Sequence, residues 1–302
     1  MRINKKYKGV IVPMITPVDE SLSIDKEAVS VLINSFVEAG VDPFILGTTG
    51  ESFSVSEKDK DELVVTAAES LKGRAILYAG ISGNCLSESI DNAQRYNELG
   101  ANVLVAHQPF YFPMNNDQLL KYFETLADSV PCPLILYNNP ITTKQSIPLE
   151  IVDRLSYHSN IFGFKDSERG IDRLDQAILL WKDREDFSHL LGWAAQSAYA
   201  LLKGSDGIVP STGNLTPYLY AELYKKTLVG DESAAYKLQD KTNAISEIYQ
   251  KDRTINQSIP ALKAMLEIEG ICKRYALPPM FSTGDEEILE IKSAMIKMAV
   301  VS

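Results

Sequence analysis

The chain has 302 residues, of which 45% are hydrophobic and 23% charged, enough apolar material for one large core or two modest ones. Its net charge of -10 repels phosphates, which excludes nucleic acid as a partner. No apolar run approaches the roughly 20 residues that span a bilayer, and no signal-peptide core follows the N-terminus, so we expect a cytoplasmic protein without membrane contact.

Eight short apolar runs recur along the first two thirds of the chain, and none alternates cleanly with polar residues. This pattern is typical of parallel strands that are buried on both faces. In chain order the runs are Gly9–Met14, Pro43–Leu46, Ala75–Ala79, Asn102–Ala106, Pro133–Tyr137, Ile161–Phe164, His189–Leu191 and Gly207–Pro210.

Amphipathic segments lie between these runs and predict helices. Asp25 and Gly40 bracket the first helix as a polar start and a glycine stop, and Ser56 to Asp59 fits a capping box for the second. The expected helices are Ile24–Ala39, Ser56–Leu71, Ser87–Leu99, Asn116–Ser129, Pro148–Ser156, Ile171–Lys182 and Ala194–Lys203.

Eight strands that alternate with helices predict an α/β fold, a (β/α)8 TIM barrel over residues 1–216. A doubly wound open sheet is the alternative. It has fewer strands, and a dinucleotide-binding version would carry a GxGxxG motif that is missing after Ile11 and Met14. Residues 217–302 predict a C-terminal helical extension packed on the barrel, with helices at Leu219–Val229, Glu232–Gln250 and Ile259–Ala276.

The cysteines and histidines predict neither a disulfide framework nor a metal site, because their number and spacing fit no known motif. We expect three buried or half-buried thiols in a reducing compartment. The residues concerned are Cys85, Cys132, Cys272, His107, His158 and His189.

Reactive residues are expected where strands end, since barrel enzymes place their chemistry at the carboxyl ends of the strands. The segment Gly47–Ser52 follows the second run, and its backbone N–H groups and threonine hydroxyls suit a small anion, although a plain turn has the same composition. Tyr137 ends the fifth run and either packs in the barrel or relays protons.

Lys165 directly follows the sixth run and is the strongest candidate for catalysis. Burial lowers the pKa of an amine, and a neutral amine attacks a carbonyl carbon to form a Schiff base. The alternatives are a surface lysine or one paired with Asp166. Arg169, in the charged loop that follows, is either solvated or meets a distal carboxylate or phosphate of the substrate.

Five motifs occur together over nearly the whole chain, namely Gly47–Ser52, Pro109–Tyr111, Tyr137–Pro140, Gly163–Lys165 and Gly207–Asn214. By these motifs the chain resembles the dihydrodipicolinate synthase and N-acetylneuraminate lyase family of pyruvate-dependent class I aldolases, closest to the 2-keto-3-deoxy sugar acid aldolase-like branch. The resemblance implies a lysine imine with pyruvate, no metal or organic cofactor, and a homo-oligomer, usually a tetramer.

The resemblance also assigns roles to the matching residues. Lys165 would form the imine, and Tyr137 would relay protons. Thr48 would link Tyr137 to Tyr111, which would reach in from a neighbouring subunit. The substrate would contact Thr49, Gly47, Val209 and Gly192.

Two departures from the family pattern narrow the expected substrate. Thr142 stands where dihydrodipicolinate synthases have an arginine, and Ala194 and Ala195 stand where sialic acid lyases have an acidic pair. Beside Trp193, these alanines predict a pocket of modest polarity. We therefore expect an aldolase for a 2-keto-3-deoxy sugar acid or a related 4-hydroxy-2-oxo acid. A dehydratase or deaminase that uses the same imine, and a non-catalytic sensor, are the alternatives.

Overall fold

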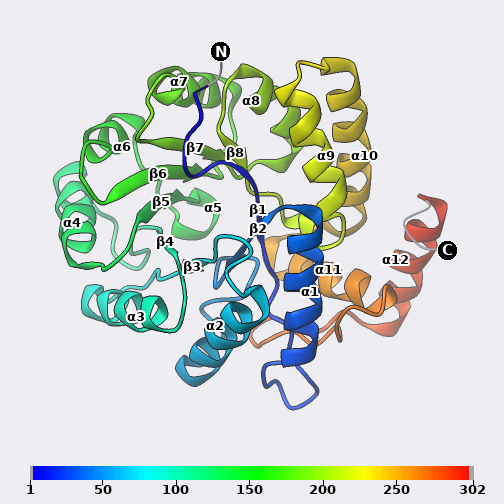
Figure 1. The fold of residues 1–302 in the computed structure, drawn as a ribbon. Helices are drawn as coiled ribbons and strands as arrows, with labels where there is room; N and C mark the ends of the chain where they lie inside the picture. The colour runs from blue at the N-terminus through cyan, green and yellow to red at the C-terminus, as the bar shows by residue number, and fades with distance from the viewer. Residues whose placement is uncertain (1–2, 299–302) are drawn as a thin grey trace.

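The computed structural model describes residues 3–298 and contains a closed barrel of eight parallel strands, with helices around it (Figure 1). Each strand pairs with the next in the chain, and β8 closes on β1, so the prediction of a TIM barrel is confirmed and an open sheet is wrong. The strands are β1 Gly9–Pro13, β2 Asp42–Ile45, β3 Tyr78–Gly80, β4 Val103–Ala106, β5 Leu134–Asn138, β6 Ile161–Asp166, β7 Ser188–Leu191 and β8 Gly207–Ile208.

Helices follow the strands and cover the outside of the barrel (Figure 1). They are α1 Lys26–Ala39, α2 Glu57–Leu71, α3 Leu86–Glu98, α4 Asn116–Ser129, α5 Pro140–Thr143, α6 Leu149–Leu155, α7 Ile171–Trp181, α8 Ser197–Lys203 and α9 Pro217–Leu228, with short 3-10 helices η1 Ala194–Gln196 and η2 Ser211–Asn214. The C-terminal helices are α10 Glu232–Gln250, α11 Ile255–Ile268 and α12 Asp285–Lys297.

The expected helix ends are present in α1 and α2. The Asp25 side chain accepts a hydrogen bond from the backbone N–H of Ala28, and Gly40 ends α1 in the left-handed region at φ 74°. Ser56 caps α2 by accepting from the N–H of Asp59, while its hydroxyl donates to the Asp59 carboxylate. The second bond differs from a capping box, in which the acidic side chain would accept from the backbone of the cap residue.

Successive side chains of each strand point alternately outward and inward, and this divides the hydrophobic core into two parts. Side chains that point outward pack under the helices in one large cluster. Side chains that point inward fill the barrel in a smaller cluster, which comprises Tyr7, Ile11, Phe44, Tyr78, Val103, Val105, Ile135, Tyr137, Leu190 and Val209. Tyr137 therefore faces the barrel interior, and its neighbour Leu136 faces the helices.

The C-terminal region departs from the expected run of continuous helices. The segment expected to be helical over Ile259–Ala276 begins earlier and ends at Ile268, and residues 269–284 contain no helix. Gly270 adopts φ 73° just past the helix end, which is the left-handed conformation that terminates helices. Pro278 and Pro279 follow and have no N–H to donate, so the chain stays irregular until α12.

Helix α9 packs against α1 and β1 and completes the ring of barrel helices, and α10 packs on α9 and α8 (Figure 1). The division into residues 1–216 and 217–302 stays a prediction, and residues 1–2 and 299–302 of it lie outside the described residues. Among the described helices none is long and apolar enough to cross a membrane. The three cysteines are free; Cys132 and Cys272 are buried, whereas Cys85 is exposed, contrary to expectation.

Candidate active site

Tyr137 and Lys165 lie side by side inside the barrel because they occupy paired positions on β5 and β6. The Lys165 Nζ atom lies 3.8 Å from the centre of the Tyr137 ring and 4.8 Å from that of Phe44. Lys165 is 5% exposed, so it is not a surface residue. Asp166, the next residue on the strand, accepts from Arg173 at 2.7 Å, so a pair between Lys165 and Asp166 is also wrong.

Burial and mutual contact shift the pKa values of Lys165 and Tyr137. Burial lowers the pKa of Lys165 below its ordinary value, and Tyr137 opposes only part of this effect. Burial by itself raises the pKa of Tyr137, but the nearby Lys165 charge and hydrogen bonds from Thr48, Ser167 and Lys165 outweigh it, so this pKa is lowered. The pKa of the amine and that of the phenol therefore both lie below their ordinary values.

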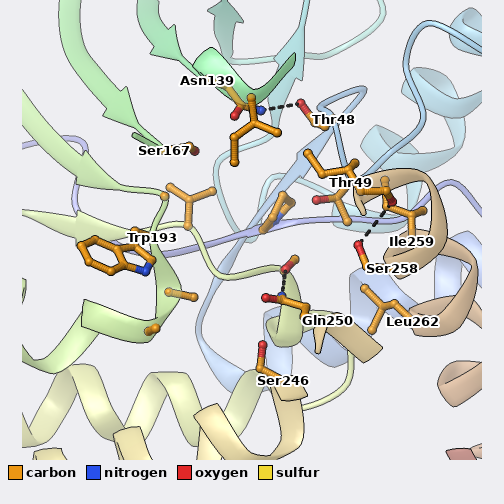
Figure 2. Close-up of a pocket in the computed structure, with 18 of the residues that line it drawn as sticks. Thr48, Thr49, Asn139, Ser167, Trp193, Ser246, Gln250, Ser258, Ile259 and Leu262 are labelled. Atoms are coloured by element: carbon orange, nitrogen blue, oxygen red, sulfur yellow. Dashed lines mark hydrogen bonds between the residues drawn. The ribbon is translucent and has the colours of Figure 1, made fainter. Parts of the chain in front are cut away.

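A chain of polar groups continues from the phenol toward the end of β2. The Tyr137 hydroxyl lies 3.2 Å from the Thr48 hydroxyl, and the Asn139 amide donates to the Tyr137 oxygen at 3.0 Å. Figure 2 shows Asn139 facing Thr48 across the upper part of the pocket. The sequence interpretation included Asn139 in a motif but assigned it no role.

His107 is a second neighbour of Tyr137 that the sequence interpretation left unassigned. Its ring meets the Tyr137 ring edge-on at 6.0 Å between centres, and Nδ1 lies 2.7 Å from the Gln108 carbonyl oxygen. Burial lowers the pKa of His107 to about 4, and the Lys165 charge adds to the effect, so the imidazole is neutral at pH 7. Within residues 3–298, no group of three His, Cys, Asp or Glu side chains is arranged to hold a metal ion.

The Gly47–Ser52 segment forms a tight turn at the cavity. Thr48 and Thr49 line the cavity, and the Thr16 hydroxyl donates to the Gly50 carbonyl at 2.6 Å. Gly47 is not among the lining residues. A Cβ atom there would lie 2.9 Å from the Phe44 ring, so Gly47 has a packing reason to lack a side chain, and its contact with substrate stays a prediction.

The cavity has a volume of about 550 Å³ and includes both remaining residues that were expected to bind substrate, Val209 and Gly192. Trp193, Ala194 and Ala195 form one apolar wall, as expected. A further part of the lining comes from α10 and α11, which sequence reasoning missed, and it combines polar side chains with the apolar residues Ile259 and Leu262. Its neutral polar residues are Asn243, Ser246, Gln250 and Ser258 (Figure 2).

The polar wall is joined to the barrel through a hydroxyl cluster at η2. The Tyr249 hydroxyl lies 2.7 Å from that of Ser211, and the Gln250 amide donates to Tyr249 at 2.7 Å. Figure 2 shows Ser246 and Gln250 below the cavity, on the side away from Asn139 and Thr48. The expectation of modest polarity therefore holds only for the wall at Trp193, because the rest of the lining includes amide and hydroxyl groups together with charged residues such as Glu247 and Lys251.

Tyr111 does not lie with the other expected catalytic residues, Lys165, Tyr137 and Thr48, in the cavity of its own chain. Its side chain is 73% exposed, and its ring meets that of Phe112 edge-on at 4.9 Å. The Asn84 side chain accepts from the backbone N–H groups of Phe110 and Tyr111, which fixes the loop. Tyr111 and Phe112 thus project from the barrel rim, and neither lines the cavity of its own chain.

Two further residues near the cavity bear on the second half of a substrate. Thr142 lies on α5, where its hydroxyl donates to the Asn139 carbonyl at 3.0 Å, so it satisfies the backbone and provides no positive charge. Arg169 lines the cavity and forms no ion pair with any residue between 3 and 298. Arg253 also lines the cavity, but Glu287 neutralises it at 2.7 Å.

Comparison with known proteins places these residues in a family context. The model of the dihydrodipicolinate synthetase family matches residues 6–298. The chain is 28% identical over 296 residues to a protein of Escherichia coli named putative 2-dehydro-3-deoxy-D-gluconate aldolase YagE, with 96% of each chain covered. It is 29% identical over 286 residues to the probable 2-dehydro-3-deoxy-D-pentonate aldolase YjhH of the same organism, with 93% of this chain and 94% of that protein covered.

Solved structures agree with the sequence comparisons. The crystal structure of YagE in complex with pyruvate superimposes with a TM-score of 0.92 at 27% identity, covering 98% of this chain and all of that one. Dihydrodipicolinate synthase from Bacteroides thetaiotaomicron gives a TM-score of 0.92 at 31% identity, with 98% of this chain and 100% of that one covered. The similar proteins thus include both sugar acid aldolases and a synthase by name.

Proposed function

Since the chain belongs to the dihydrodipicolinate synthetase family of lyases, we propose that it is a Schiff-base-forming aldolase that cleaves or forms a 2-keto-3-deoxy sugar acid or a related 4-hydroxy-2-oxo acid. Its products in the cleavage direction are pyruvate and an aldehyde. The observation that carries the proposal is the buried Lys165 amine, 3.8 Å from the centre of the Tyr137 ring.

The first step joins Lys165 to the substrate. The neutral amine attacks the 2-oxo carbon, and the carbonyl oxygen leaves as water after it receives one proton from the amine nitrogen and one from the Tyr137 phenol, so that a protonated imine and a Tyr137 phenolate remain. The lowered pKa of Lys165 supplies the neutral amine. In this proposal Thr48 and Thr49 hold the substrate carboxylate beside it, which is supported by the fact that both residues line the same cavity as Lys165.

The second step breaks a carbon–carbon bond. The 4-hydroxyl loses its proton to the Tyr137 phenolate, the bond between C3 and C4 breaks, and its electron pair moves into the imine to form an enamine. The aldehyde leaves, C3 takes a proton, and water releases pyruvate from Lys165. The lowered pKa of Tyr137 supports its role as the base, and Asn139 and Thr48 hold its hydroxyl in place.

The polar wall of the cavity supports a hydroxylated aldehyde part. Gln250, Ser246 and Ser258 present neutral hydrogen-bonding groups, which suit the hydroxyls of a sugar chain. YagE and YjhH carry the names of aldolases for 2-dehydro-3-deoxy acids, and 2-dehydro is another term for 2-keto. Thr142 argues against a synthase that binds a second carboxylate at this position, because its hydroxyl is used by the backbone and it carries no positive charge.

We extend the proposal to Tyr111, which would complete the site of a neighbouring copy in a homo-oligomer. An aromatic side chain that is 73% exposed on a fixed loop supports such a contact. Size measurement in solution, together with turnover of a Tyr111→Phe variant, tests this extension. A fully active monomer would contradict it.

The decisive experiment is reduction with borohydride in the presence of pyruvate, followed by mass spectrometry. The wild-type chain should gain one covalent adduct on Lys165, and Lys165→Ala should gain none and lose turnover. A panel of 2-keto-3-deoxy acids then separates the reactions: release of an aldehyde with pyruvate supports the aldolase, whereas loss of water or ammonia without an aldehyde supports the dehydratase or deaminase. No adduct on the wild type would leave only a binding protein.

A further inference from the structure

Glu51 closes the turn that carries the two threonines of the site. Its backbone N–H donates to the Thr48 carbonyl at 3.1 Å, and its own carbonyl accepts from Ser54 at 2.7 Å. Glu51 adopts φ 55°, a left-handed conformation that residues other than glycine rarely adopt. The shape of the turn around Thr49 thus depends on a strained residue that other contacts must hold in place.

Those contacts come from the C-terminal region, more than 200 residues away in the sequence. One Glu51 carboxylate oxygen pairs with the Lys263 ammonium, and the other accepts from the backbone N–H of Leu277 at 2.7 Å. Lys263 also donates to the Tyr275 carbonyl at 2.8 Å. Both charged side chains are 0% exposed.

A fully buried ion pair is a costly means of stabilising a fold, because both charges lose their hydration. Apolar side chains of similar size often serve stability as well or better. Such a pair instead defines one arrangement, since either charge without its partner would be strongly unfavourable. Glu51 and Lys263 therefore fix where the turn lies relative to α11.

Helix α11 carries residues of the cavity as well as this anchor. Ser258, Ile259 and Leu262 line the cavity, and Lys263 follows directly in the chain. Thr49 lines the same cavity, and Figure 2 draws it together with Ser258 and Ile259. One helix thus forms part of the distal wall and also holds the turn that faces it.

We propose that the Glu51–Lys263 pair is a positioning device that sets the Thr48–Thr49 turn for the carboxylate of the 2-oxo acid. The inference rests on the proposed function, because it takes pyruvate as the ligand of the turn. The C-terminal helices are then required for recognition of the carboxylate as well as for contact with the distal part of the substrate. Neither residue touches the reacting atoms, so both act through the turn.

The test is the pyruvate dependence of borohydride trapping in the full chain. In Lys263→Met and in Glu51→Gln, the pyruvate concentration at half-maximal trapping should rise about tenfold or more, because small displacements of binding groups weaken recognition strongly. The trapping rate at saturating pyruvate should stay within about twofold, because Lys165 is intact. The double variant should be no worse than the poorer single variant, since both remove one interaction.

Lys5→Met is the matched control. Lys5 pairs with Asp206 at 2.8 Å, and the side chains are 1% and 4% exposed, but this pair lies before β1 and β8, at the opposite end of the barrel. Lys5→Met should lower thermal stability without changing half-maximal trapping. If Lys5→Met and Lys263→Met raise the half-maximal concentration equally, or if Lys263→Met leaves it unchanged, the positioning role is wrong. Should Lys263→Met not fold, the same comparison between Glu51→Gln and Lys5→Met decides.

The two proposals fail in different ways. Absence of a pyruvate adduct on the wild-type chain overturns the proposed function and this inference with it. A wild-type adduct together with unchanged half-maximal trapping in Glu51→Gln and Lys263→Met overturns only the positioning role of the pair.

Discussion

Tyr137 and Lys165 are paired in register across β5 and β6, and this places the amine 3.8 Å from the centre of the phenol ring. Parallel strands in register present paired residues on the same face of the sheet, here the barrel interior. The contact couples the two ionisations, because each charged form stabilises the other while burial opposes both.

This coupling predicts the pH dependence of imine formation. The neutral amine is the nucleophile, so the rate of borohydride trapping should rise with pH and level off above the pKa of Lys165. Because burial lowers this pKa, the midpoint should fall below the ordinary value of 10.5. In Tyr137→Phe the midpoint should fall further, since Tyr137 raises the lysine pKa. A midpoint at or above 10.5 in the wild type would contradict a desolvated amine.

Loss of the phenol should slow turnover more than imine formation. Tyr137→Phe removes the proposed proton relay, and we expect kcat for sugar acid cleavage to fall by about 10²-fold or more. Tyr78→Phe is the control, because the Tyr78 hydroxyl is buried in the same barrel but has no hydrogen-bond partner among residues 3–298. Equal loss of kcat in both variants would indicate a packing effect and not proton transfer.

The polar wall from α10 should matter for the sugar part of the substrate alone. Gln250→Leu removes an amide that lines the cavity and that also donates to Tyr249. Loss of one or two hydrogen bonds between this amide and the sugar hydroxyls predicts a KM for the sugar acid that is about tenfold higher. Half-maximal trapping by pyruvate should not change, because pyruvate lacks the hydroxylated part that this wall is proposed to bind. Gln176→Leu, on the exposed face of α7, controls for the substitution itself. An unchanged KM would show that Gln250 does not bind the sugar part of the substrate.

Asp42 predicts a pH-dependent stability that is separate from the active site. It begins β2, where its side chain accepts from the backbone N–H of Ile76 at 2.9 Å, and burial raises its pKa from 3.8 to about 6. A raised carboxyl pKa means that the folded chain binds the proton more tightly than the unfolded one. Its contribution to stability is therefore present at low pH and is lost as the pH rises from about 4 to about 6.

An Asp42→Asn variant tests this sign. The amide keeps an acceptor for Ile76 and never ionises, so the free energy of unfolding at pH 7 should rise by about 1 to 3 kcal/mol. Between pH 4 and 6 the free energy of unfolding should fall less in the variant than in the wild type. Denaturant unfolding at several pH values measures both effects. Borohydride trapping should be unchanged, because Asp42 lies at the opposite end of the barrel from Lys165. Lower stability of the variant at pH 7 would contradict the raised pKa.

The sequence alone was sufficient to predict the barrel and to single out Lys165 and Tyr137, which the structure brings into contact. Strands buried on both faces must be continuously apolar, and this local property marked all eight of them. A lysine next to such an apolar run has little exposed surface to occupy, which made Lys165 the strongest candidate, and the structure decided its burial against the alternative of a surface lysine. The ends of α1 were equally local, because Asp25 and Gly40 act within one turn of the helix.

The tertiary structure decided which distant residues complete the site. Gln250 and Ser258 face the cavity only because α10 and α11 pack at one particular angle to the barrel, and no periodic pattern specifies which turn of an appended helix meets a strand end. The Glu51–Lys263 contact has the same origin, since it joins a turn and a helix 212 positions apart through two side chains whose pairing depends on shared burial. Local propensity acts over a few residues, and therefore the wall and the anchor of the site could be found only once the chain had folded.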